Sequence, residues 1–207
     1  MAQQAVPTKG NLMAAKKSLT LARVGFDLLD RKRNILIREL MSLIDRAAEI
    51  QTVIDDAFAS AYRALERANI TLGFCDEISK TVPIEDSIEL DYRSIMGVEI
   101  PVLRFEAPEQ RRLSYGLGNT NACLDEAVVL FTRAKELTVE LAEVENSVYR
   151  LAVAIKKTQK RANALKNIMI PQFEQDIKFI SDALDEKDRE EFSRLKVIKK
   201  QKTEEQL

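Results

Sequence analysis

The feature that most limits how this chain can fold is a row of apolar residues, spaced alternately three and four apart, at each end. In the N-terminal row, counted from Leu12, sixteen of seventeen positions are apolar and the exception is Arg33. A heptad pattern of this length predicts a long helix that supercoils in a left-handed sense around a partner helix. The seventeen positions are Leu12, Ala15, Leu19, Ala22, Phe26, Leu29, Arg33, Leu36, Leu40, Leu43, Ala47, Ile50, Ile54, Ala57, Ala61, Ala64 and Ala68.

The second row occupies the C-terminal part of the chain, and its one polar position is Thr158. Asn121 lies just before it and is expected to cap the helix, while Asp125 and Glu126 place negative charge in the first turn. Two such helices in one chain predict an all-α dominated fold, a long antiparallel two-helix left-handed coiled coil. The positions are Cys123, Ala127, Leu130, Ala134, Leu137, Leu141, Val144, Val148, Leu151, Ile155, Thr158, Ala162, Leu165 and Met169.

The heptad is absent between the two rows, where most of the Gly and Pro residues of the chain lie. Short helical turns are expected over 73–80 and 84–91, followed by a small β-hairpin over 95–105 that includes Pro101. The predicted organisation is one elongated domain. It comprises an N-terminal coiled-coil helix (1–71), a middle region (72–120) and a C-terminal coiled-coil helix (121–207) with a kink near Pro171 and a charged tail.

The two polar residues of the seam are predicted to meet. If the antiparallel helices close near residues 70 and 121, Arg33 lies opposite Thr158. A lone polar layer in an apolar seam disfavours slipped alignments, so this layer would fix the register. The alternative is coincidence, because helix ends inferred from sequence are uncertain by about two to four residues.

Charge is unevenly distributed although the formal net charge is −1. Residues 1–50 carry nine Lys and Arg against five Asp and Glu, residues 151–180 carry six against two, and residues 51–110 carry five against twelve. The charge runs are either a solvated helix surface or a basic end that inserts into an acidic partner. Pro171 interrupts an apolar run whose members, Ile168, Ile170 and Phe173, cannot all face a two-helix seam, so part of this end is expected to contact another chain.

Catalytic, cofactor and metal sites are not expected. The chain has no histidine, its Gly116-Leu117-Gly118 segment lacks the residues of a phosphate loop, and Cys75 and Cys123 have no metal-binding spacing. Reduced thiols in a cytosolic protein are expected, with a disulfide as the alternative. We expect neither a signal peptide nor direct membrane insertion, and the near-zero net charge gives no case for nucleic acid.

Three separated blocks of sequence carry a family signature. They are Pro7-Thr8-Lys9 with the segment from Lys16 to Arg33, Ser114-Tyr115-Gly116 with Asn121 to Asp125, and Lys160-Arg161-Ala162-Asn163-Ala164-Leu165 with Ile170-Pro171. In this order and spacing they resemble the D subunit of the V-type (vacuolar and archaeal-type) ATPases and ATP synthases.

This resemblance implies a non-catalytic central rotor shaft that couples ATP synthesis or hydrolysis to ion transport. Its partners would be the A and B subunits of the catalytic hexamer, the F subunit, and the C subunit (also called d) above the membrane rotor ring. The location would be cytoplasmic and peripheral to the membrane. A generic coiled-coil scaffold or a membrane-remodelling hairpin is the alternative.

The resemblance and the charge pattern together assign candidate contacts. Contacts with the A/B sleeve are expected from Arg23, Arg31, Lys32, Arg33, Lys156, Lys157, Lys160, Arg161, Ile168, Ile170 and Phe173. Docking of the F and C subunits is expected at the hairpin, through Ile95, Val98, Ile100, Val102 and Phe105.

Overall fold

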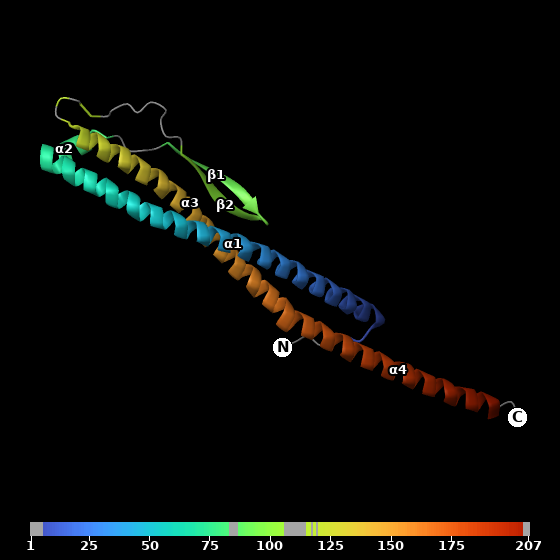
Figure 1. The fold of residues 1–207 in the computed structure, drawn as a ribbon. Helices are drawn as coiled ribbons and strands as arrows, with labels where there is room; N and C mark the ends of the chain where they lie inside the picture. The colour runs from blue at the N-terminus through green and yellow to red at the C-terminus, as the bar shows by residue number, and fades with distance from the viewer. Residues whose placement is uncertain (1–5, 83–86, 106–114, 117, 119, 205–207) are drawn as a thin grey trace. The chain divides into compact units, whose positions relative to one another are not determined.

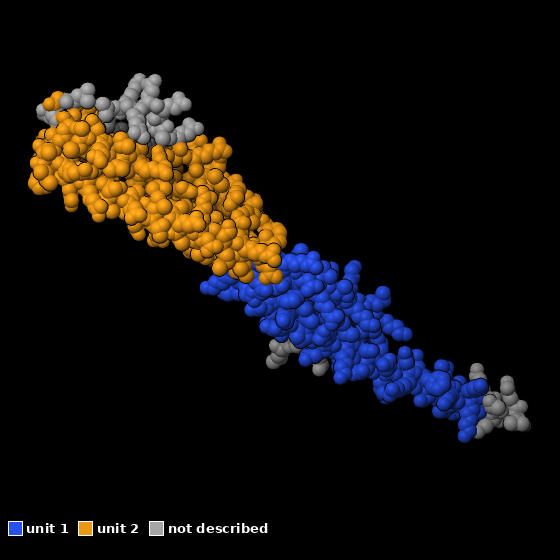
Figure 2. Space-filling view, in the orientation of Figure 1, with its two compact units in different colours: residues 1–33, 156–207 blue, residues 34–155 orange. Residues whose placement is uncertain are grey.

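The computed structural model describes residues 6–82, 87–105, 115, 116, 118 and 120–204. Its elements are α1 (Lys9–Leu72), α2 (Asp76–Ser79), β1 (Ile88–Ile95), β2 (Val98–Phe105), α3 (Ala122–Ala164), the π-helical turn η2 (Leu165–Met169) and α4 (Ile170–Glu204) (Figure 1). The chain divides into two compact units (Figure 2). Unit 1 is residues 1–33 with 156–207, and unit 2 is residues 34–155. The two long helical ends with a hairpin between them confirm the predicted fold class.

The heptad positions lie in the seam as predicted, with one exception. All seventeen positions on α1 are buried or half-buried, and so are the C-terminal positions from Cys123 to Leu165. Met169 is 39% exposed, so its assignment to the seam was wrong. The π-helical turn η2 ends at this residue.

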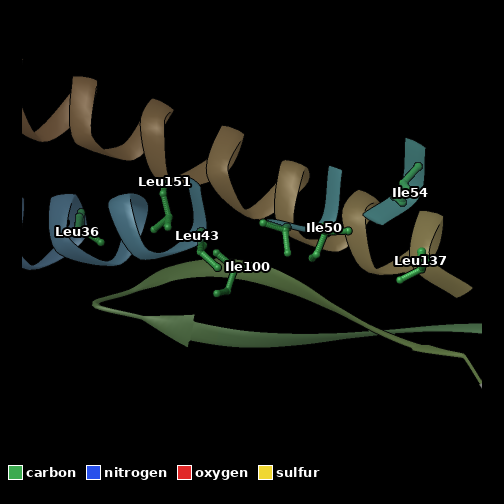
Figure 3. Packing of buried hydrophobic residues seen from close by; sticks show 8 residues of the cluster. Leu36, Leu43, Ile50, Ile54, Ile100, Leu137 and Leu151 are labelled. Atoms are coloured by element: carbon green, nitrogen blue, oxygen red, sulfur yellow. The ribbon is translucent and has the colours of Figure 1, made fainter. Parts of the chain in front are cut away.

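Large aliphatic side chains make the core of unit 2. They come from α1, from α3 and, through Ile100, from strand β2 (Figure 3). A pair of helices buries one stripe of each, so a strand laid along the seam adds a third wall that excludes water from it. The fully enclosed members are Leu36, Ile100, Val144 and Leu151.

The hairpin pairs β1 with β2 in an antiparallel register that begins with Ile95 opposite Val98 and ends with Ile88 opposite Phe105. Met96 and Gly97 form the turn, both with positive φ, as a two-residue type I′ turn requires. The hairpin therefore begins seven residues earlier than expected. The expected helical turn over 84–91 was wrong from Ile88 onward, and residues 83–86 lie outside the described part of the chain.

Local sequence explains where the long helices end and begin in unit 2. Gly73 follows α1 with a φ of 80°, and its N–H donates to the carbonyl of Asn69 at 3.0 Å, which is a left-handed C-terminal cap. The Asn121 side chain accepts from the N–H of Leu124 at 3.0 Å, so the predicted N-terminal cap of α3 is confirmed.

A small cluster of side chains packs beside these helix ends. Ala68, Tyr115 and Leu124 are buried in it, and the free thiols of Cys75 and Cys123 pack against it. The Tyr115 hydroxyl donates to the Asp125 carboxylate at 2.7 Å. Burial, together with this hydrogen bond, raises the pKa of Tyr115 to about 12.

Over the residues that are described, none of the helices is long and apolar enough to cross a bilayer.

Removing one seam side chain should be costly, whereas removing an exposed one should not. Leu36→Ala is expected to lower the free energy of unfolding by about 2–5 kcal/mol, because Leu36 is fully buried. Leu28→Ala is the matched control on the same helix, with a residue 67% exposed, and it should change the free energy by less than about 0.5 kcal/mol. Urea unfolding followed by circular dichroism measures both, and equal losses would contradict the assigned seam.

Stability should also fall at high pH through Tyr115. Its pKa is about 12 in the folded chain against an ordinary value of 10.0, so the unfolded state ionises first. The stabilisation is complete below pH 10 and is lost as the pH rises to about 12. Between pH 9 and 11 the wild type should lose roughly 1–2 kcal/mol more than Tyr115→Phe, as measured by urea unfolding. Identical alkaline losses in the two proteins would argue against this role.

Candidate interaction surfaces

The predicted sleeve residues all fall in unit 1. Among the basic side chains on α1 and α3, Lys32 and Arg33 are half-buried, Arg33 at its seam position, and the others are exposed. Of the three apolar residues, Ile168 is exposed, while Ile170 and Phe173 are half-buried. The fold therefore brings the two basic clusters, far apart in sequence, into one compact unit.

Ion pairs within unit 1 occupy some of these basic groups. Arg23 donates to Glu174 of α4 at 2.7 Å, and Arg33 pairs with Asp30 at 2.6 Å. Both arginines are at least partly exposed, so each pair contributes at most about 1 kcal/mol to stability. These arginines could exchange partners with a protein bound at this surface at small cost.

The proposed register layer has a more detailed geometry than sequence could supply. Thr158 is buried in the seam. Arg33 donates a hydrogen bond to the side chain of Gln159, the residue next to Thr158, at 2.7 Å. Gln159 in turn donates to Asn163 at 2.7 Å. The bond from Arg33 to Gln159 thus joins α1 to α3 at the level of the predicted layer, and the bond from Gln159 to Asn163 lies within α3. That this layer fixes the register stays a prediction.

An exposed apolar stripe on unit 1 was not predicted. Leu21, Val24 and Leu28 lie on one face of α1 and are all exposed. Their spacing of three and four residues matches the heptad and is offset from the seam positions Ala22 and Leu29. This second row could have been found in the sequence by testing for two apolar faces on one helix. Apolar surface in such a row is typical of a site that contacts another protein.

The two units have opposite charge. Unit 1 contains 20 Lys and Arg against 12 Asp and Glu, a net charge of +8. Unit 2 contains 12 against 21, a net charge of −9. The near-neutral total therefore conceals one strongly basic and one strongly acidic surface, and each favours partners of the opposite sign.

The hairpin residues predicted to dock partners face the helices to different degrees. Ile100 is 1% exposed and belongs to the core, so in this structure its contribution is packing. Ile95, Val98, Val102 and Phe105 are half-buried, and the ammonium group of Lys135 lies 5.1 Å from the centre of the Phe105 ring.

The neighbouring strand β1 presents the exposed apolar side chains of this hairpin. Ile88, Leu90 and Tyr92 are exposed and alternate with charged residues. That alternation was the sequence signal for this strand, and it was missed.

Apolar grooves continue from the base of the hairpin along unit 2. One has a volume of about 460 Å³ and includes Phe58, Ile88, Leu103 and Phe131 in its lining. A second, of about 540 Å³, shares Phe131 and continues to Tyr115. Both linings are predominantly apolar and can receive apolar side chains of a partner. Among the described residues, no cluster of three or more potential ligands is placed to hold a metal ion.

Comparisons with known proteins agree over nearly the whole chain. The family described as the D subunit of ATP synthase matches residues 11–200. The V-type ATP synthase D subunit of Thermotoga neapolitana is 44% identical over 195 residues, which cover 93% of this chain and 96% of that protein. The A-type ATP synthase D subunits of Methanosphaera stadtmanae and Pyrococcus abyssi are 37% and 38% identical, over 94% and 93% of this chain and 92% of each relative. The chain therefore belongs to the D-subunit family of the V-type and A-type ATP synthases.

Proposed function

We propose that this chain is the non-catalytic central-stalk component of a V/A-type rotary ATPase or ATP synthase. In this role it transmits torque between the ion-translocating ring in the membrane and the catalytic hexamer of A and B subunits. It thereby couples ATP synthesis or hydrolysis to proton or sodium transport. It works at the cytoplasmic side of the membrane, within the soluble sector of the complex.

The observation that carries this proposal is the composition of the surface of unit 1. Unit 1 combines a net charge of +8 with an exposed apolar row that includes Leu21, Val24 and Leu28. A solvated helix surface needs the charges but not the apolar row. A segment surrounded by other proteins needs both the charges and the apolar row. The partner proteins cover the apolar row, and their acidic groups pair with the basic ones. We therefore assign unit 1 to the A/B sleeve.

Unit 2 is the proposed docking region for the F and C (d) subunits. Its net charge is −9, and its hairpin carries the exposed apolar side chains Ile88, Leu90 and Tyr92. The grooves beside the hairpin extend that apolar surface along the helices. A varied surface of this kind can hold several partners at distinct places, whereas a regular coiled coil presents similar faces along its length.

Reconstitution tests the function directly. The chain should bind its own A and B subunits as a single copy per threefold hexamer, which mass photometry and cryo-electron microscopy can count. The coiled-coil scaffold alternative predicts no defined complex with A and B. Absence of a complex, with helicity by circular dichroism unchanged, would overturn the rotor proposal.

Charge reversal tests the sleeve surface within that complex. One reversal, such as Lys157→Glu, should weaken binding to the A/B hexamer only a few-fold, because an exposed ion pair contributes about 0.5 kcal/mol. Reversing Lys156, Lys157, Lys160 and Arg161 together to Glu should weaken it roughly 30-fold, and the loss should shrink at high salt.

Four reversals in unit 2 provide the matched control. Asp55, Asp56, Glu66 and Glu145 are exposed, and changing all four to Lys should leave the affinity within about three-fold, since screening limits their reach to about 8 Å. If net charge rather than this surface governed binding, the control set would strengthen it by about as much as the first set weakens it, because the two sets change the net charge by eight in opposite directions.

A further inference from the structure

The seam of unit 1 contains one irregular interval, at the π-helical turn η2. Before this turn Thr158, Ala162 and Leu165 face the seam at the spacing of a heptad. After it, the residues that turn inward begin at Ile170 and continue as Phe173, Ile177, Ile180 and Leu184. Their intervals are again three and four. The interval from Leu165 to Ile170 is five, one residue more than a heptad allows.

The exposed fractions of side chains on opposite faces of the helix show that the seam positions shift by one residue after η2. If the heptad had continued unchanged, Met169 and Phe179 would lie in the seam, but they are 39% and 47% exposed. Ile180, one residue further along, is fully buried. All seam positions beyond η2 are therefore displaced by one residue in the sequence.

The hydrogen bonding of η2 accounts for this displacement. The N–H of Ile170 donates to the carbonyl of Leu165, five residues back, where an α-helix would bond four back. The two residues joined by this bond are the two seam residues that flank the long interval. A turn that holds one extra residue lets the next seam residue return to the inner face.

We propose that η2 is a phase correction that absorbs a one-residue insertion and keeps the apolar seam of unit 1 continuous into α4. It also places both Ile168 and Met169 on the outer face of the turn. This inference rests on the packing within unit 1 and does not depend on the proposed function.

Pro171 offers a competing explanation. A proline inside an α-helix lacks an N–H, and its ring clashes with the carbonyl four residues back, here that of Asn167. The wider turn could exist for this reason alone. The two explanations predict different results when the proline is removed. Only a phase correction should persist in Pro171→Ala.

The test uses Pro171→Ala as its background and changes the length of the turn in both directions. Deleting Asn167 restores an interval of four between Leu165 and Ile170, so an unbroken α-helix would keep the seam in phase. The melting temperature should stay the same or rise. Inserting one Ala after Asn167 adds a second extra residue, rotates Ile180 out of the seam, and should lower the melting temperature by about 5 °C or more.

Thiol labelling reports directly which residues beyond η2 face the seam. In a chain with Cys75 and Cys123 changed to Ala, Ile180→Cys should react slowly and Phe179→Cys quickly, both in the Pro171→Ala background and after the deletion. The insertion should make Ile180→Cys reactive. The proposal is overturned if Pro171→Ala alone reverses the labelling pattern, or if deletion and insertion are equally tolerated or equally harmful.

Discussion

The apolar seam is the interaction on which the rest of this structure depends. A helix in a two-helix rod has one narrow buried stripe, so each layer must contribute through very few side chains. Leu36 and Leu151 each bury a large aliphatic group, which is favourable by about 1.5–3 kcal/mol. Towards the end of α1 the layers shrink to Ala61, Ala64 and Ala68, which remove much less apolar surface from water. The hairpin adds Ile100 among the large residues, and the Tyr115 cluster supplements the small ones.

How well each element could be predicted depends on how local its cause is. The seam and the cap at Asn121 depend on side-chain periodicity and on neighbouring residues, and sequence alone placed both. Strand β1 was missed because seven of its eight residues are exposed and it has no continuous apolar run, so overall hydrophobicity was a weak guide. Only the alternation of Ile88, Leu90 and Tyr92 with charged residues indicated it. The hydrogen bond from Arg33 to Gln159 depends on side-chain reach across two helices, and residue spacing does not determine it.

The same reasoning explains the error at Met169. A heptad template applied to the sequence accepts Met169 because it is apolar and falls at the correct count from Ala162. The correct assignment appears only when the apolar pattern is followed from the C-terminal side, through Ile180, Ile177 and Phe173. The second heptad found in this way is displaced by one residue from the first heptad where the two meet. Periodicity must therefore be tested from both ends of a seam, since a single template cannot detect the place where two phases join.

The separation of charge between the two units requires that the apolar seam supplies most of the free energy of folding. Concentrating a net +8 in unit 1 and −9 in unit 2 creates repulsion within each unit, which weakens the compact state. Exposed pairs such as Arg23 with Glu174 return little of that loss. An apolar seam is not weakened by electrostatic screening and does not depend on the sign of the surface charge, so it can hold the helices while the outer faces differ between the units. A coiled coil stabilised mainly by surface ion pairs would need alternating charges along its length, and could not have one basic and one acidic unit.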